Sequence, residues 1–254
     1  MKKKNLYLST IDEHAQDLAK QYGLGLEIAE YGTAWNMDEQ FAQTDAIVRP
    51  KMKCTDRFTF HGPYSELFPC AVDPKVRAIA ADRFRQAIAL AEDYGIHKII
   101  FHGGFNPWLY FPCWYKEQCE IFWKKFVDNI PDDMVVCVEN VLEETPDMLG
   151  DVLRAVDSPK LRMCLDVGHA HAYSKNTPME WLESCKDLIA HFHVHNNDSS
   201  WDTHSPLDCG TIPMKQLLAA IDKNCPDATV TLELMDAASS VEWLLKNKIL
   251  EESI

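Results

Sequence analysis

The chain has 254 residues, of which 46% are hydrophobic and 25% charged, a composition that is ordinary for a soluble globular protein and excludes a largely disordered one. Its formal net charge of -14 repels polyanions, so nucleic acid is not an expected partner. No stretch reaches the roughly 18 apolar residues of a membrane span, and no apolar run follows the N-terminal Met-Lys-Lys-Lys, as a secretory signal requires.

Apolar runs of strand length alternate with segments of helical spacing along the whole chain. Gly95, for example, ends the longest predicted helix in the manner of a C-terminal glycine cap. The predicted strands span residues 5–10, 24–31, 57–61, 98–101, 135–138, 162–166, 189–195 and 229–234. The predicted helices span residues 12–22, 37–45, 74–94, 116–129, 147–156, 179–186, 214–224 and 240–248.

Strands that alternate with helices imply right-handed crossovers and a parallel sheet. Eight such units follow one another here, and no Ser-, Gly- or Pro-rich linker divides them. The sequence therefore predicts an α/β protein with a single (β/α)8 TIM barrel domain over residues 1–254. A doubly wound open sheet is the alternative, and the lack of G-x-G-x-x-G after the first strand argues against it.

Seven of the eight predicted strands finish in a carboxylate or an imidazole, and the C-terminal ends of the strands form the active-site face of a TIM barrel. These residues are Glu27, His61, His102, Glu139, Asp166, His195 and Glu233. Because side chains alternate along a strand, Val136 and Val138 facing the helices leave Glu139 on the barrel axis. Several carboxylates at the barrel mouth with no cluster of lysines beside them would repel one another unless protons or cations offset their charge. The strand ends therefore predict a metal site.

The sixth and seventh strands carry further imidazoles. His169 follows Asp166 by three residues across the turn-permissive Gly168, a pairing that suits a divalent metal, although an Asp at a strand end is also a common helix N-cap. His191 and His193 share the parity of His195 but lie deeper in the strand, so we assign them structural hydrogen-bonding roles.

The nine cysteines are an odd number and form no C-x-x-C pair, so neither a disulfide framework nor a cysteine-rich zinc site is indicated. Cys137 and Cys164 lie inside apolar runs and are expected to be small buried residues. Reduced thiols and the lack of a signal peptide predict a cytoplasmic protein.

Seven ordered motifs resemble those of the xylose isomerase-like TIM barrel superfamily, which groups sugar and sugar phosphate isomerases and epimerases with endonuclease IV-like enzymes. The motifs are HGPY at 61–64, FHGG at 101–104, VEN at 138–140, LDVGH at 165–169, HNND at 195–198, DTH at 202–204 followed by PLDCGTI, and LEL at 232–234. Together they cover nearly the whole chain.

The isomerase and epimerase branch implies one divalent ion, either manganese, magnesium or cobalt, and a role in carbohydrate metabolism. The implied ligands are Glu139, Asp166, His195 and Glu233. The resemblance further implies that Glu139 and Glu233 transfer a proton through an enediolate of a sugar or sugar phosphate. Trp108 and Trp114 in the aromatic loop are predicted to cover the substrate, with barrel-mouth packing or a contact within a homo-oligomer as the alternative.

The endonuclease IV-like branch implies a multinuclear zinc phosphodiester hydrolase that uses five further residues. These are His61, His102, His169, Asp202 and His204. The net charge and the lack of a Lys/Arg run at the strand ends argue against DNA as substrate, but not against a small phosphorylated molecule. We favour the isomerase or epimerase. A metal-stabilised barrel without catalysis is disfavoured, because a barrel does not need this ligand set for its stability.

Overall fold

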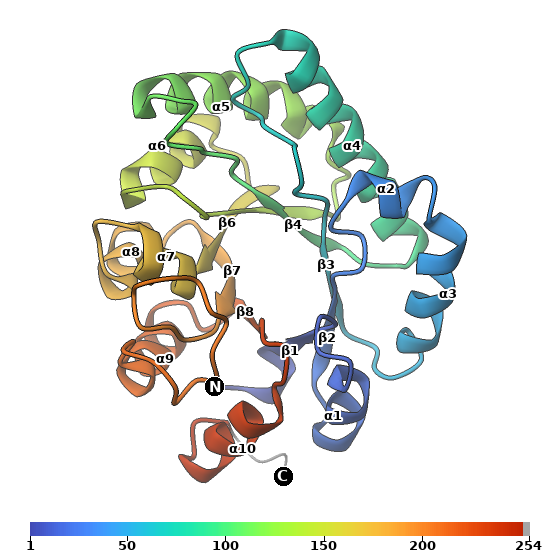
Figure 1. The fold of residues 1–254 in the computed structure, drawn as a ribbon, viewed down its shortest axis with the longest axis vertical. Coiled ribbons are helices and arrows are strands. Elements are labelled where there is room, and N and C mark those ends of the chain that lie inside the picture. The colour runs from blue at the N-terminus through green and yellow to red at the C-terminus, as the bar shows by residue number, and fades with distance from the viewer. Residues whose placement is uncertain (251–254) are drawn as a thin grey trace.

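The structure is a computed structural model that describes residues 1–250. Eight parallel strands close into a barrel in the order β1 to β8, with helices around the outside (Figure 1), which confirms the predicted (β/α)8 fold. The strands are β1 (Leu6–Ser9), β2 (Gly25–Ile28), β3 (Phe58–His61), β4 (Lys98–His102), β5 (Val135–Glu139), β6 (Leu161–Asp166), β7 (Ile189–Val194) and β8 (Thr229–Leu232).

The helices largely follow the predicted segments, and among the described residues none is long and apolar enough to cross a membrane. They are α1 (Ala15–Tyr22), α2 (Ala34–Met37), α3 (Phe41–Lys51), α4 (Pro74–Asp93), α5 (Pro112–Phe126), α6 (Pro146–Val156), α7 (Val167–Tyr173), α8 (Pro178–Cys185), α9 (Met214–Asn224) and α10 (Ala238–Lys246). Several begin with proline at their first position, where the missing N–H costs nothing.

Two helical segments differ from the sequence prediction. The single helix predicted over 37–45 is replaced by α2 and α3, and α3 continues to Lys51 through Pro50 near its end. Helix α7 was not predicted. It begins directly after β6, where the Asp166 side chain accepts a hydrogen bond of 2.6 Å from the backbone N–H of His169. Asp166 is therefore a helix N-cap as well as a strand end.

The main hydrophobic core lies between the strands and the surrounding helices. Phe84 of α4 stacks on Phe101 of β4 with ring centroids 4.1 Å apart, and Trp123 of α5 lies 5.8 Å from the Phe84 ring. The outward residues of β5 and β6 belong to the same cluster, as their parity predicted; they are Val136, Val138, Met163 and Leu165. Burial of this layer supplies the main hydrophobic stabilisation of the barrel.

The inside of the barrel is only partly apolar. Ile100, Cys137 and Cys164 form a small separate cluster there. Near the N-terminal ends of the strands, the Lys98 ammonium donates hydrogen bonds to the Thr229 hydroxyl at 2.8 Å and to the Ala190 carbonyl at 3.0 Å. The side chains that point to the barrel axis therefore include polar groups already at the end of the barrel opposite the mouth.

Candidate functional site

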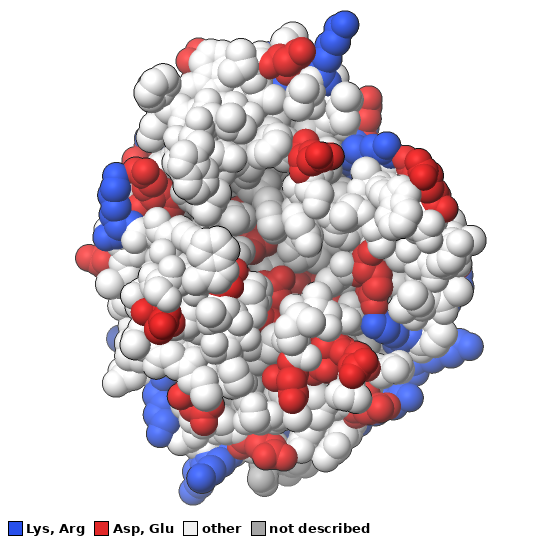
Figure 2. All heavy atoms as spheres, viewed as in Figure 1, with Lys and Arg blue, Asp and Glu red and all other residues white. Residues whose placement is uncertain are grey.

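The C-terminal ends of the strands surround a cavity of about 410 Å³. Its lining residues are Ile11, His61, Tyr64, His102, Glu139, His169, Thr203, His204, Glu233 and Met235. Figure 2 shows acidic side chains within the central hollow of the face it draws, whereas lysines and arginines lie around the periphery. The mouth thus concentrates negative charge, as the strand-end residues predicted, and this field attracts cations.

Four side chains from different strands converge at the bottom of this mouth. The donor atoms of Glu139, Asp166, His193 and Glu233 all lie within 4.8 Å of one another, and all four residues are buried. His193 is central, with Nδ1 lying 3.2 Å from Glu139 Oε1, 3.4 Å from Glu233 Oε2 and 4.0 Å from Asp166 Oδ2. Three of the four predicted ligands are therefore brought together.

The histidine of this group is His193, while the predicted ligand His195 belongs to a further group with His204 and Glu233, whose donor atoms also lie within 4.8 Å of one another. In the register of β6 and β7, Asp166 pairs with His193, and His195 lies two residues nearer the mouth. His195 Nε2 lies 3.1 Å from Asp166 Oδ2, but its Nδ1 faces Asp202 Oδ1 at 3.6 Å. Its ring stacks on His204 with centroids 3.9 Å apart, so His195 lies between two groups of donors.

The second group of donors consists of His169, Asp202 and His204, whose atoms lie within 4.8 Å of one another. Asp202 Oδ2 lies 3.2 Å from His169 Nε2 and 2.9 Å from His204 Nε2. The structure thus brings these three predicted residues together, with His195 connecting them to Asp166.

His61 and His102 complete the site on the side of Glu139. The Nε2 atom of each lies 3.5 Å from Glu139 Oε2. Tyr64 stacks on the His102 ring with centroids 4.6 Å apart and lines the cavity. Sequence reasoning did not select Tyr64, although it stands in the HGPY motif that begins at the predicted His61.

Three of these imidazoles are oriented by backbone carbonyl groups. The contacts are His61 Nδ1 to Gly62 O at 2.9 Å, His169 Nδ1 to Asn140 O at 3.0 Å and His204 Nδ1 to Glu233 O at 2.8 Å. A carbonyl oxygen only accepts, so Nδ1 donates the proton, and Nε2 carries the lone pair whenever the imidazole is neutral. Metal-binding histidines are commonly fixed in this way.

Buried polar atoms without a hydrogen-bond partner concentrate at the same place. In the described part of the chain they include both carboxylate oxygens of Glu139, Oε2 of Glu233, Nδ1 of His193 and His195, and Oδ1 of Asp202. Such atoms are rare in proteins and call for a partner. Oxygen and imidazole donors suit manganese, magnesium, cobalt or zinc, so the residues fit a divalent metal.

Charge within the site is balanced between carboxylates and imidazoles. Burial raises the pKa of Glu139, but the neighbouring His193 and His102 outweigh it and hold that pKa well below its ordinary value. Burial lowers the pKa of His169, yet Asp166 and Asp202 raise it well above its ordinary value. Desolvation lowers the pKa of His102 to about 3. The Glu139 carboxylate is therefore ionised at neutral pH, as metal binding requires.

Gly168 is required by the packing of His195 rather than by a turn. It lies in α7, and a Cβ atom built on it would approach His195 Cε1 to 1.9 Å. The imidazole thus lies directly on the glycine backbone. The sequence analysis assigned this glycine to a turn, whereas the structure shows that it permits the close approach of the His195 side chain to α7.

We expect Gly168→Ala to lower the free energy of unfolding by about 1–3 kcal/mol, the usual cost of overpacking. Urea unfolding followed by circular dichroism measures the change. Gly150→Ala in α6 is the matched control, because the nearest atoms to its Cβ are at 3.1 and 3.2 Å, and its effect should stay within about 1 kcal/mol. Equal effects of the two substitutions would contradict the assignment.

The two predicted substrate-loop tryptophans do not line the mouth cavity. Trp108 is 83% exposed on the loop before α5. Trp114 lies in α5, and its indole N–H donates a hydrogen bond of 2.8 Å to the Cys70 carbonyl. The cavity is lined by other large side chains from the strand-end loops, Tyr64 and Met235.

Comparison with known proteins identifies similar sequences. The profile of the family described as "Xylose isomerase-like TIM barrel" matches residues 17–248. The uncharacterized protein MJ1311 of Methanocaldococcus jannaschii is 27% identical over 216 residues, which cover 76% of this chain and 72% of that protein. Protein MJ1188 of the same organism is 29% identical over 205 residues, covering 76% and 73%.

Solved structures share the fold at low sequence identity. A D-tagatose 3-epimerase-like protein superposes with a TM-score of 0.76 at 20% identity, covering 95% of this chain and 96% of that one. A Thermus thermophilus protein soaked with ZnCl2 gives 0.73 at 22% identity, covering 95% and 97%. The IolI protein with a bound zinc atom gives 0.74 at 13% identity, covering 96% of each chain.

Proposed function

Since the chain belongs to the xylose isomerase-like TIM barrel family, we propose that it is a divalent-metal-dependent isomerase or epimerase of a sugar or sugar phosphate. We also propose that residues 1–254 form one domain. The observation that carries the functional proposal is the convergence of Glu139, Asp166, His193 and Glu233, whose buried donor atoms lie within 4.8 Å of one another. Proteins of similar fold that are epimerases by name, such as D-psicose 3-epimerase of Clostridium cellulolyticum H10, support the choice of reaction.

The proposed ligands are these four residues, with His193 in the position that the sequence analysis gave to His195. These residues would hold a divalent ion, which would supply polarisation of the substrate's carbonyl group. His195 is proposed to orient Asp166, because its Nε2 lies 3.1 Å from Asp166 Oδ2. Asn140 supports the same strand end, since its side chain accepts from the Asp166 N–H at 2.9 Å and donates to the Asp166 carbonyl at 3.0 Å.

Glu139 and Glu233 are the proposed acid–base pair. They stand at the ends of β5 and β8, which are not neighbours in the barrel, so their carboxylates approach a substrate from different sides. One removes the proton from the carbon next to the carbonyl group, which leaves an enediolate, and the other returns a proton. Both side chains are buried, and exclusion of water protects such an intermediate.

A small sugar or sugar phosphate is the proposed partner. The acidic side chains in the central hollow (Figure 2) would repel the phosphates of a nucleic acid. Trp108 is a proposed contact for the substrate or for a second subunit, because this residue is 83% exposed. The odd number of cysteines, which are free in the described structure, favours a reducing, cytoplasmic location.

A multinuclear zinc phosphodiester hydrolase is the second candidate. The group formed by His169, Asp202 and His204 favours it, because a single-ion isomerase has no need of a further imidazole-rich donor set. Similar folds determined with zinc support zinc as a metal that such a site binds. In this reaction the additional ions would activate water and stabilise the leaving oxygen.

Metal analysis of the purified protein distinguishes the two candidates. We expect about one manganese, magnesium or cobalt ion per chain if the protein is an isomerase or epimerase, and about two or three zinc ions if it is a hydrolase. Activity is then tested with D-tagatose, D-psicose and D-fructose in D2O, where proton transfer exchanges a carbon-bound hydrogen. Failure to bind any divalent metal under all loading conditions would exclude both candidates.

A further inference from the structure

The mouth cavity has two sides of different chemistry. The imidazoles and carboxylates that line it are His61, His102, Glu139, His169, His204 and Glu233. Three large apolar side chains also line it, Ile11, Tyr64 and Met235, and they follow β1, β3 and β8 in the chain. Because β8, β1, β2 and β3 are consecutive in the closed barrel, these three residues form an apolar wall on one side of the mouth.

Tyr64 is held in a fixed position in the apolar wall. Its ring stacks on His102 and also lies against the backbone at Gly32, where a Cβ atom would approach Tyr64 Cε1 to 2.7 Å. The Tyr64 N–H donates a hydrogen bond of 3.0 Å to the Gly32 carbonyl. The residue is nevertheless 45% exposed. An aromatic ring fixed in this way offers contact area to a ligand at a low cost in conformational entropy.

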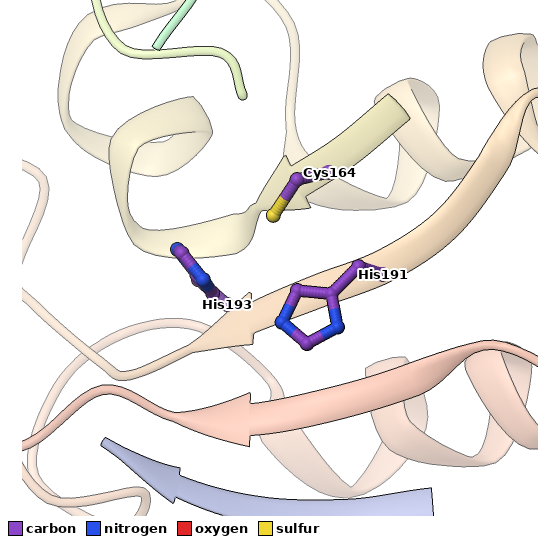
Figure 3. Close-up of side chains that lie close together, drawn as sticks. All are labelled: Cys164, His191 and His193. Carbon is purple, nitrogen blue, oxygen red and sulfur yellow. The ribbon is translucent and has the colours of Figure 1, made fainter. Parts of the chain in front are cut away.

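The interior of the barrel below the donor groups is filled. Figure 3 shows Cys164 of β6 beside His191 and His193 of β7, and all three side chains are fully buried. The inside of a TIM barrel is a packed core rather than a pore. A sugar bound at the donor groups would therefore extend outward, and its far end would lie against the apolar wall.

Cationic groups at the mouth are paired with carboxylates. The cavity-lining residues of the described chain include no lysine or arginine. Lys51 of α3 contacts the loop after β1, but its ammonium group pairs with the Glu30 carboxylate. His169 and His204 both face Asp202, at 3.2 and 2.9 Å. A phosphate group would have to compete with these carboxylates, and its charge would be repelled by them.

Backbone N–H groups that commonly bind phosphate are also occupied. At the N-terminus of α7, the N–H of His169 donates to the Asp166 carboxylate at 2.6 Å. In the Gly-Gly turn after β4, the N–H of Gly103 donates to the Glu139 carbonyl at 2.8 Å. Helix N-termini and glycine turns bind phosphate through free N–H groups, and these two are already satisfied within the protein.

We propose that the substrate is an uncharged sugar, whose end away from the donor groups lies against the apolar wall, and that sugar phosphates are excluded. The inference rests on the proposed function and narrows its substrate class. A hydroxymethyl or methyl end presents C–H groups that can pack against Ile11, Tyr64 and Met235. A phosphate in the same place would lose its hydration and gain no cation in return.

The first experiment compares free and phosphorylated sugars as substrates of the Mn²⁺-loaded full-length protein. Hydrogen exchange in D2O is followed by proton NMR with D-tagatose and D-fructose and with the 6-phosphates of the same two sugars. We expect kcat/KM for each free sugar to exceed that for its phosphate by about 100-fold or more, because repulsion between like charges strongly suppresses a wrong ligand. A ratio near one, or a preference for the phosphates, would overturn the proposal.

The second experiment adds a charge to the apolar wall. Met235 is 69% exposed, so its side chain can be changed without disturbing the interior. Met235→Lys should raise kcat/KM for D-fructose 6-phosphate relative to D-fructose about 10-fold, an effect that falls as salt is added. Met235→Gln has a similar length without the charge, and as the matched control it should leave the ratio unchanged. Equal ratios in the two variants would contradict the exclusion of phosphate by charge.

Binding is also measured without turnover, by saturation-transfer difference NMR of the Mg²⁺-loaded protein. D-fructose should receive the strongest transfer at the hydrogens of C5 and C6, the end assigned to the apolar wall. Tyr64→Ala should weaken this transfer, whereas Tyr64→Phe, which keeps the ring, should retain it. Transfer to D-fructose 6-phosphate that free D-fructose displaces would count against the proposal.

The outcomes separate this inference from the proposed function. If no form of D-tagatose, D-psicose or D-fructose, free or phosphorylated, exchanges its carbon-bound hydrogen, the proposed function is wrong. If the phosphates exchange with equal or higher kcat/KM, only the uncharged substrate is refuted, and the isomerase or epimerase reaction stands.

Discussion

Replacing Glu139 or Glu233 with glutamine is expected to lower kcat about 10²- to 10⁴-fold, the usual contribution of a general acid or base. Glutamine keeps the shape of the side chain and a carbonyl oxygen but accepts no proton. Exchange of the substrate's carbon-bound hydrogen with D2O, followed by proton NMR, should therefore stop in both variants. Retained exchange in either variant would exclude that glutamate as an obligatory base.

A matched control separates lost proton transfer from a disturbed interior. Glu143 is also a buried glutamate, and it accepts a hydrogen bond of 2.8 Å from the Tyr115 hydroxyl outside the donor group. Glu143→Gln should therefore leave exchange close to that of the unmodified enzyme. Metal content is measured in each variant, because glutamine at position 139 or 233 also weakens a proposed ligand.

Substitution of His193 should weaken metal binding more than substitution of His195. His193→Gln removes a proposed ligand, so its loss of Mn²⁺ affinity should exceed the roughly 10- to 100-fold effect expected of an outer partner. His195→Gln removes only a neighbour of Asp166 and should lie within that range. Calorimetric titration of both variants gives the ranking. A larger loss for His195→Gln would restore His195 as the ligand, as the sequence analysis expected.

Periodicity alone was sufficient to predict the barrel and the direction of its side chains. Val136 and Val138 lie in the outer core and Cys137 in the inner cluster, because a pleated strand must alternate its two faces. The same rule placed Glu139, Asp166 and Glu233 on the axis. These features depend on the local sequence of one strand at a time, so they can be predicted from the sequence before the fold is known.

The position of each residue along the barrel axis could not be predicted from the periodicity of its strand. The stagger between strands is set by barrel closure, and only the register that pairs Asp166 with His193 shows how high each histidine of β7 lies relative to the acids. Glu27 has the same difficulty: it pairs with Ser9 and Thr59 below the mouth, although it resembles the other strand-end acids in sequence. Helix α7 escaped prediction because its N-cap, Asp166, is also the last residue of β6.

The alternation along β7 has a consequence for how the protein can change. Phe192 and Val194 belong to the outer core, whereas His191 and His193 face the axis, where they contact Glu27 at 3.0 Å. The outward residues of this strand thus stabilise the fold, and the inward residues that alternate with them face the interior of the site. Inward positions can be exchanged to suit another ion or substrate while the outward ones still hold the barrel closed, so new activities can arise on this scaffold without rebuilding it.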